Sequence, residues 1–299
     1  MKVLSIKEPF ATLILTKKKH IETRSWKTNY RGELFIHASI QELKNRTKEL
    51  QSLIANNNLN CGKIICSCNL VDCIYMSEDY IKKIKDNNYQ EYLCGEYKIG
   101  RYAWVLEDVK PLDKKIPAKG NLGIWNYYNE FDVLNLMTNI KYGWMDCNNN
   151  LHTDFDKFKD NYVLQTPKEV IKNNIGVCRD QVELERYYLK NNKLDIKTFF
   201  LVNYNDSECK THTFLTYNKA GKYYWFENSW EKFKGIHKYN TLDDLLWDVR
   251  DKFIKNELSE NIDIEKIVIR EYNKPKSHIN VLEFFKHCEK GKIYNLRKD

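Results

Sequence analysis

Three residues in the second half of the sequence have the types of a nucleophile, a base and an acid. Cys178 follows a glycine in "NNIGVCRDQVELERYYLKNN" and opens a segment over 178–191 whose apolar residues have helical spacing and whose reverse face is polar. Unpaired N–H groups and the positive end of the dipole at the start of a helix favour a thiolate, the reactive form of cysteine. Cys178 is therefore a candidate nucleophile, and an inert, buried cysteine is the alternative.

A cysteine nucleophile needs a general base, and His212 in "THTFLTYNKAGKYYWFENSW" is the downstream histidine on a predicted strand. This stretch predicts a β-hairpin with its turn at "NKAG". Pairing Tyr217 with Lys222 places Glu227 opposite His212, where a carboxylate would hold the imidazole ring and its tautomer. A register shifted by one residue would bring Asn228 to that place instead.

Cys178 thus opens a predicted helix, and His212 and Glu227 follow on two successive predicted strands. This order resembles the transglutaminase-like (papain-like) superfamily. The resemblance covers residues 165–232, from "QTPKEVIKNNIGVCRDQ" through "YYWFENSW". It implies Cys178 as nucleophile, His212 as base and Glu227 as the orienting acid, where the superfamily usually has aspartate. It also implies a domain over 129–299 in which a core helix packs on an antiparallel sheet.

The same resemblance implies an oxyanion hole, which needs two hydrogen-bond donors. The backbone N–H of Cys178 is one candidate. For the side-chain donor, or a residue supporting it, the sequence offers Gln165, Tyr142, Trp144 and Asn228.

The N-terminal half predicts a small unit rich in strands, such as "RGELFIHA" and "RYAWVLEDVKPL". The stretches "LSIKEPFATLILTKKKHIETRSWKTNYRGELFIHAS" and "GRYAWVLEDVKPLDKKIPAKGNLGIWN" resemble the ASCH family (activating signal cointegrator homology) over nearly all of residues 1–128. The resemblance implies a PUA-like β-barrel with a basic cleft for RNA, single-stranded DNA or a modified nucleobase. The whole chain is thus expected to be of the α+β class.

Cations beside aromatic faces are what a nucleic-acid cleft requires, since the cations hold phosphates and the rings stack on bases. The ASCH resemblance and this chemistry together select six residues: Lys19, Glu22, Arg24, Trp26, Arg31 and Trp104. Core tryptophans and solvated cations are the alternative. Some bacterial relatives resemble amidohydrolases with a Lys-x-x-Thr pair, but Glu22 stands at the threonine position, so a nucleobase amidase is not expected here.

The composition of the chain indicates the kind of partner and the cellular compartment to expect. Residues 1–130 hold 21 Lys and Arg against 15 Asp and Glu, so most of the net charge of +8 lies in this half and favours a polyanionic partner. Nine cysteines without a small-scaffold pattern indicate free thiols in a reducing compartment. Neither a membrane span nor a secretory signal is recognisable, so we expect a cytoplasmic protein.

No metal or other cofactor is expected. The cysteines at 61, 66, 68 and 73 lack the paired Cys-x-x-Cys spacing of structural zinc sites, and a core strand explains them. The sequence therefore favours a cysteine-dependent hydrolase of protein or other amide substrates, joined to a nucleic-acid or nucleotide-binding module. An acyltransferase that cross-links amines, and a non-catalytic nucleic-acid-binding protein with a degenerate second domain, are the alternatives.

Overall fold

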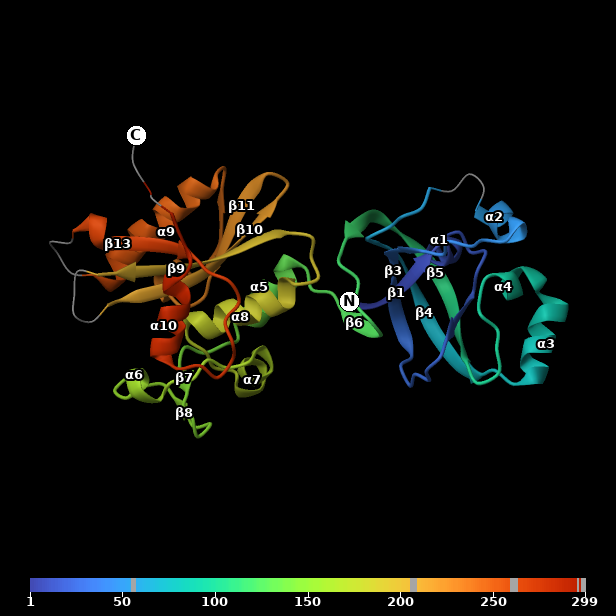
Figure 1. The fold of residues 1–299 in the computed structure, drawn as a ribbon, viewed down its shortest axis with the longest axis horizontal. Coiled ribbons are helices and arrows are strands. Elements are labelled where there is room, and N and C mark those ends of the chain that lie inside the picture. The colour runs from blue at the N-terminus through green and yellow to red at the C-terminus, as the bar shows by residue number, and fades with distance from the viewer. Residues whose placement is uncertain (55–57, 205–208, 259–262, 295, 297–299) are drawn as a thin grey trace. The chain divides into compact units, whose positions relative to one another are not determined.

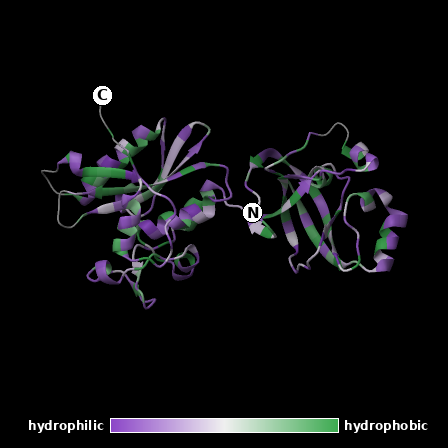
Figure 2. Cartoon of the chain, in the orientation of Figure 1, coloured by the Kyte–Doolittle hydropathy of each residue, from purple (hydrophilic) through white to green (hydrophobic). Residues whose placement is uncertain are grey.

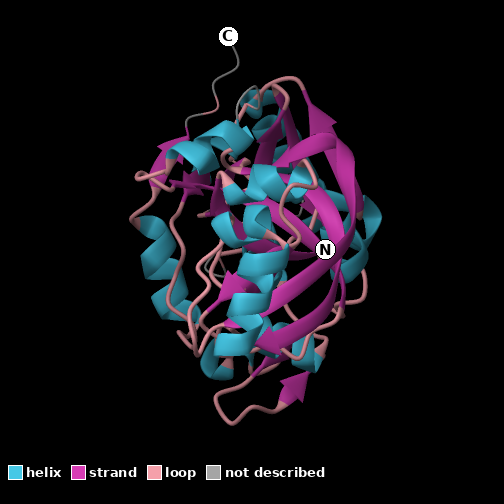
Figure 3. Cartoon of the chain, turned by 90° about the vertical axis from the view of Figure 1, so that its right-hand side faces the viewer, coloured by secondary structure: helices cyan, strands magenta, loops and turns pink. Residues whose placement is uncertain are grey.

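The computed structural model describes residues 1–54, 58–204, 209–258, 263–294 and 296. The chain forms two units, each built around its own six-stranded sheet. The first comprises Met1–Tyr127 with Asn191–Lys193, and the second comprises Tyr128–Lys190 with Leu194–Asp299. Each unit contains both helices and strands, the two kinds of element that Figure 3 distinguishes by colour, which confirms the expected α+β class.

The N-terminal unit is a sheet with short helices. Its elements, in chain order, are β1 (Lys2–Glu8), α1 (Phe10–Leu15), β2 (Ile21–Arg24), β3 (Gly32–Glu42), α2 (Lys48–Ile54), β4 (Lys63–Tyr75), α3 (Glu78–Asn87), α4 (Tyr89–Leu93), β5 (Tyr102–Pro117) and β6 (Ile124–Asn126).

The strand order in this sheet is β2-β5-β4-β3-β1-β6, with β1 and β3 parallel and the other neighbours antiparallel. Register shifts in the long β4–β5 pair mark bulges, which bend a sheet. No pairing in the described part of the chain joins β2 to β6, so the expected barrel is observed as an open sheet. Leu4, Ile36, Ile65 and Leu106 belong to its core.

The C-terminal unit is larger. Its elements are α5 (Glu130–Met137), β7 (Trp144–Met145), β8 (Leu151–His152), α6 (Phe158–Asn161), α7 (Pro167–Asn173), α8 (Cys178–Leu189), β9 (Asp195–Asn203), β10 (Thr211–Lys219), β11 (Lys222–Glu227), η1 (Glu231–Phe233), β12 (Gly235–Tyr239), α9 (Leu242–Glu257), η2 (Ile264–Lys266), β13 (Ile267–Glu271), α10 (Val281–Glu289) and β14 (Lys292–Tyr294).

The C-terminal sheet is antiparallel, with the order β12-β11-β10-β9-β13-β14, and it is covered on both faces. Successive residues of β9 point to opposite faces, as a strand requires. Phe200 and Val202 pack in the core that contains α8, while Phe199 and Leu201 pack in the core that contains α9. Figure 1 shows α8 and α9 on opposite faces of the sheet, and Figure 2 shows hydrophobic residues along its central strands.

Helix α8 lies at the centre of this unit and is buried on nearly all sides. The reverse face is polar, as the sequence indicates, but it is buried as well, with Arg179, Gln181, Glu183 and Glu185 among its residues. Strand β10 of the sheet covers one side of α8, and helices α5 and α7 contact other sides of it. A helix enclosed in this way is a rigid support for a residue at its N-terminus.

Candidate active site

The N-terminus of α8 is held by the carboxylate of Asp180, which is fully buried. Its Oδ2 accepts the Val177 N–H (3.0 Å), and its Oδ1 accepts the Gln165 N–H (2.9 Å) and the Tyr162 hydroxyl (3.0 Å). Gly176 allows this approach, since a Cβ there would lie 2.9 Å from Asp180 Cβ. Cys178 is the first residue of the helix, so its own N–H has no partner within it.

The β10–β11 hairpin brings the other two candidates together, although in a register different from the expected one. Lys219 pairs with Lys222 around a two-residue turn at Ala220 and Gly221, both with positive φ as a tight hairpin turn requires. The predicted pairing of Tyr217 with Lys222 is therefore wrong by two residues. An even shift keeps every side chain on its face of the sheet.

His212 and Glu227 consequently meet. His212 Nε2 lies 3.0 Å from Glu227 Oε2. Glu227 Oε1 is held by two backbone donors in the turn after β11, the N–H groups of Ser229 (2.5 Å) and Trp230 (2.9 Å). The carboxylate is thus fixed with one oxygen turned to the imidazole ring, and the same ring is the main group that favours a charged Cys178 sulfur.

The electrostatics favour a charged cysteine–histidine pair. Burial by itself raises the pKa of the Cys178 thiol, but the hydrogen bond and charge of His212, followed by Arg179 and the Thr213 hydroxyl, bring it below its ordinary value. Burial lowers the pKa of His212, but Glu227 and then Cys178 raise it to about 10. The two shifts have the signs of a thiolate beside an imidazolium.

The three candidate catalytic residues are shielded from solvent. Cys178 is 6% exposed, His212 3% and Glu227 2%. The Trp230 indole stacks on the imidazole with 3.8 Å between ring centroids, and its Nε1 is anchored to Glu257 (2.8 Å). Low solvent access strengthens the interactions among these charges.

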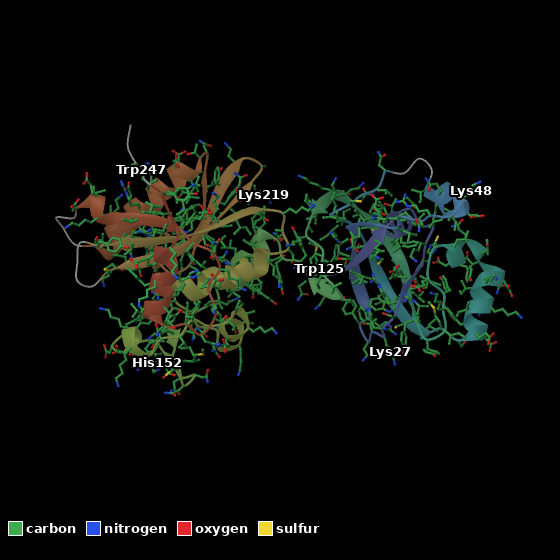
Figure 4. The ribbon with its side chains drawn as sticks, in the orientation of Figure 1. Lys27, Lys48, Trp125, His152, Lys219 and Trp247 are labelled. Carbon is green, nitrogen blue, oxygen red and sulfur yellow. The ribbon has the colours of Figure 1, made fainter. Side chains whose placement is uncertain are left out.

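The candidate donors Gln165, Trp144 and Asn228 have structural partners. Gln165 Nε2 donates to the Ile175 carbonyl (3.0 Å) and so braces the segment leading to Cys178. Trp144 Nε1 donates to the Asp154 carbonyl (2.5 Å), and its indole stacks on His152, labelled in Figure 4.

Asn228 ties the turn after β11 to α5. Its Nδ2 donates to the carbonyls of Met137 (3.0 Å) and Ile140 (3.4 Å). Glu227, and not Asn228, is the residue that contacts His212.

Tyr142 is the side-chain candidate whose hydroxyl is influenced by the charge of Cys178. Burial, and after it Cys178, raises the pKa of its hydroxyl well above the ordinary value, although the residue as a whole is 45% exposed. The ring is partly exposed and stacks on Phe155. Backbone hydrogen bonds between Lys141 and the segment before Cys178 hold this loop in place.

Thr213 and Asp180 are site residues that sequence reasoning missed. The buried Thr213 hydroxyl has no hydrogen-bond partner among the described residues, and it is one of the groups that offset the effect of burial on the pKa of the Cys178 thiol. Thr213 carries no recognisable signal. Asp180 does, because an acid at the third position of a helix commonly bonds back to the backbone N–H at its start.

In the N-terminal unit, two of the six residues predicted to contact nucleic acid are buried, so this role is wrong for them. Lys19 is fully buried, and its ammonium group donates to the carbonyls of Ile21 and Cys94 (2.5 Å each), so it is not available to a phosphate. Trp104 is also fully buried, so its ring cannot stack on a base. Both residues stabilise the fold of this unit.

Of the other four candidates, Glu22 is also buried, whereas Arg24, Arg31 and Trp26 are partly exposed. Glu22 pairs with Arg24 (3.1 Å) and is largely buried, whereas the Arg24 side chain is 23% exposed. Arg31 is 40% exposed and pairs with Asp72 (3.0 Å). Trp26 is 38% exposed, with its edge against Trp104, and it precedes the exposed Lys27 labelled in Figure 4.

The part of the chain that the structure describes contains no group of three or more His, Cys, Asp or Glu side chains able to hold a metal ion. Burial raises the pKa of Cys66 and of Cys68 in β4 to about 12, as expected for core thiols. Within the described ranges, no helix is both long and apolar enough to cross a bilayer.

Comparison with known proteins divides the chain in the same way. Residues 4–116 match the family model of the ASCH domain, and residues 125–248 match one described as a transglutaminase-like domain. "Activating signal cointegrator 1" of Homo sapiens and that of Mus musculus are each 28% identical over 126 residues. These matches cover 41% of this chain and 21% of each relative, so the chain spans about a fifth of their length.

Among solved structures, the chain is similar to the ASCH protein from Zymomonas mobilis. The sequence identity is 16% and the TM-score is 0.26, and the match covers 47% of this chain and 80% of that one.

Proposed function

We propose that this chain, which carries an N-terminal ASCH domain followed by a transglutaminase-like domain, is a cysteine-dependent amide hydrolase. The observation that supports it most is the buried contact of Glu227 with His212 (3.0 Å), the histidine that offsets the effect of burial on the pKa of the Cys178 thiol. Nucleophile, base and orienting acid lie in the order that a catalytic triad needs.

In the first half of the reaction, the Cys178 thiolate attacks the carbonyl carbon of an amide and forms a C–S bond. The negative charge that develops on the carbonyl oxygen is stabilised by the Cys178 N–H and the Tyr142 hydroxyl. His212 gives its proton to the leaving nitrogen, the C–N bond breaks, and an amine departs. A thioester on Cys178 remains.

In the second half, the now neutral His212 takes a proton from water, and the hydroxide attacks the thioester carbonyl. The C–S bond breaks, the carboxylic acid leaves, and the thiolate–imidazolium pair is restored. Glu227 keeps the imidazole oriented and stabilises its positive charge throughout. The chemistry of acyl transfer differs only in that an amine takes the place of water.

The first test is the pH dependence of Cys178 alkylation by iodoacetamide, followed by peptide mass spectrometry in the wild type and in His212→Ala. Alkylation of Cys178 should persist well below the ordinary thiol pKa of about 8.5 and shift to higher pH in the variant. The exposed Cys147 in the same digest serves as the reference thiol. Since burial slows the reagent at every pH, the shapes of the profiles are compared and not the absolute rates.

A Cys178 profile that is the same with and without His212 would contradict the triad and leave the non-catalytic binding protein as the better description. A profile that depends on His212 would justify a search among amide substrates, with Cys178→Ala as the blank.

For the N-terminal domain we propose binding of RNA, single-stranded DNA or a modified nucleobase. The support is a half-exposed ring, Trp26, near the partly exposed guanidinium groups of Arg24 and Arg31 in the sequence, in the half of the chain with the larger basic excess. Rings stack on bases and guanidinium groups hold phosphates. This binding should be salt-dependent and should not need Cys178.

A further inference from the structure

Two small cavities lie along one face of α8, and both are lined by Glu185. The first is lined by Cys178, Val182 and Glu185 of the helix, together with residues of β10, β11 and the turn after β11. The second is lined by Glu185 and Leu189, together with residues of α5, β10, β11 and β12. Spacings of three and four residues place these side chains on one face of a helix. Glu185 therefore stands between the nucleophile and a second, mostly apolar space.

Among the described residues, the carboxyl group of Glu185 has no hydrogen-bond or ion-pair partner, although the residue is only 5% exposed. The neighbouring Arg186 is engaged elsewhere, because its guanidinium group contacts Glu183 (3.2 Å) and Thr198 (2.7 Å). Burial, and after it the charge of Glu227, raises the pKa of Glu185 well above its ordinary value. An unpartnered Glu185 therefore holds a proton.

A buried carboxyl group of this kind needs an explanation, since buried polar groups are normally hydrogen-bonded. Of the described residues that line the first cavity, Cys178 and Glu227 also ionise, and both become negative. The imidazole of His212 is already paired with Glu227 (3.0 Å). In the second cavity, Glu130 is likewise paired, with Lys219. A small cation is therefore the ligand that complements this space, because it would supply the charge that the carboxyl group lacks.

We propose that Glu185 forms a subsite for a primary ammonium group, so that the amide substrate of Cys178 carries such a group on a short chain. The inference rests on the proposed function, because it names a substrate class for the same nucleophile. Glu185 releases its proton to solvent when the cation enters, and the two opposite charges then pair within the cavity.

The position of Glu185 on the helix supports this assignment. Seven residues along an α-helix correspond to about 10 Å, and helical side chains point back toward the N-terminus, which brings the carboxyl group toward Cys178. A chain attached to the sulfur would thus need only a few bonds to reach it. The small size of both cavities suits an unbranched chain and not a bulky side chain.

The test uses two thiosulfonates of nearly equal size, each of which attaches its chain to a cysteine sulfur through a disulfide bond. The chain of 2-aminoethyl methanethiosulfonate ends in an ammonium group, and that of propyl methanethiosulfonate ends in a methyl group. The rates of Cys178 modification by both reagents at pH 7 are measured by peptide mass spectrometry. Their ratio, cationic over neutral, is divided by the same ratio for the exposed Cys147. This quotient does not depend on the thiolate fraction, because both reagents need the thiolate equally.

In Glu185→Gln, which removes the charge at the same length, the quotient should be about tenfold or more below that of the wild type. The matched control is Glu183→Gln, two residues away on α8, where a carboxyl group of similar burial lines neither cavity and pairs with Arg186. It should leave the quotient unchanged. If Glu185→Gln does not fold by circular dichroism, Glu185→Met replaces it, with the same expected result.

Equal quotients for the wild type and the Glu185 variant would overturn the proposal and leave Glu185 as a neutral carboxyl group packed against the sheet. An equal fall in Glu183→Gln would overturn it too, because the effect would then belong to the charge of α8 as a whole. So would a Cys178 that reacts with neither reagent while Cys147 reacts, since the cavity would admit no substrate chain. Failure of the triad is a different result, because it requires an iodoacetamide profile of Cys178 that is unchanged in His212→Ala.

Discussion

At the scale of single residues, the negative charge of Glu227 should control the reactivity of Cys178 through His212. In Glu227→Gln the amide can still contact the ring, but the imidazolium loses its counter-ion, so the pKa of His212 should fall and that of Cys178 rise. We expect Cys178 alkylation at pH 6 to slow by about tenfold or more, measured with iodoacetamide and mass spectrometry.

The matched control for this change is Glu231→Gln, an exposed carboxylate four residues further on, whose side chain is 86% exposed and pairs with Lys234. It should leave the Cys178 profile unchanged. Equal profiles for the two variants would show that Glu227 serves the turn after β11 and not the imidazole.

Residue types and their order were enough to predict which three side chains to examine, but burial was not predictable at this scale. Lys19 was expected in a cleft because the ASCH resemblance places the cleft lysine at this position and a cation can hold a phosphate. Its partners are backbone carbonyls, one of them at Cys94, 75 residues away, and nothing local indicates that contact. Trp104 was misassigned for the same reason, since a tryptophan fits a core and a base-stacking surface equally well.

At the scale of elements, the start of α8 depends on Asp180, and replacing it tests how the nucleophile is positioned. Asp180→Asn keeps one acceptor oxygen, whereas the carboxylate serves three donors, so at least one buried donor loses its partner. The cost should be about 1–3 kcal/mol in the free energy of unfolding, measured by urea denaturation. Asp156→Asn, which alters an exposed residue on the loop before α6, is the control and should change stability by less than about 0.5 kcal/mol.

The pH dependence of this cost has a definite sign. The folded pKa of Asp180 is about 7, above the unfolded value of about 3.9, so its ionisation opposes folding between these two pH values. The stability of the wild type should therefore decline relative to Asp180→Asn as the pH rises from about 4 to 7. The opposite trend would mean that the buried carboxylate is stabilised by its three donors more than burial destabilises it.

The elements themselves were largely predictable, and the register between them was not. The start of α8 followed from the helical spacing of the apolar residues after Cys178. The hairpin turn lacks an Asn-Gly or Asp-Gly pair, so the sequence did not show that Ala220 and Gly221 alone form it. His212 and Glu227 nevertheless meet, because an error of two residues preserves the face of each side chain.

At the scale of the whole molecule, the two units have separate cores, so nucleic-acid binding by one need not depend on the reactive thiol of the other. Their division was predictable from the cluster of Pro117, Gly120 and Gly123 before the second half, a pattern typical of turns between units. The contribution of Asn191–Lys193 to the first unit was not, because that segment lies within the sequence of the second.

Nucleic-acid binding and thiol reactivity should therefore be separable by substitution. Trp26→Ala combined with Arg31→Ala removes an exposed ring and an exposed cation of the N-terminal unit. The double variant should bind labelled single-stranded RNA or DNA at least tenfold more weakly in fluorescence anisotropy, and its affinity should fall less steeply with salt. Its Cys178 alkylation profile should match the wild type.

The reciprocal variant, Cys178→Ala, should lose the alkylated peptide and keep full affinity and salt dependence. Lys110→Ala, which removes an exposed charge from β5 in the same unit, controls for a general loss of positive charge and should weaken binding only slightly. If the double variant and Lys110→Ala weaken binding equally, the binding is non-specific attraction to a basic surface. If Cys178→Ala also loses affinity, the nucleic acid contacts the C-terminal unit, and the ASCH domain alone does not account for it.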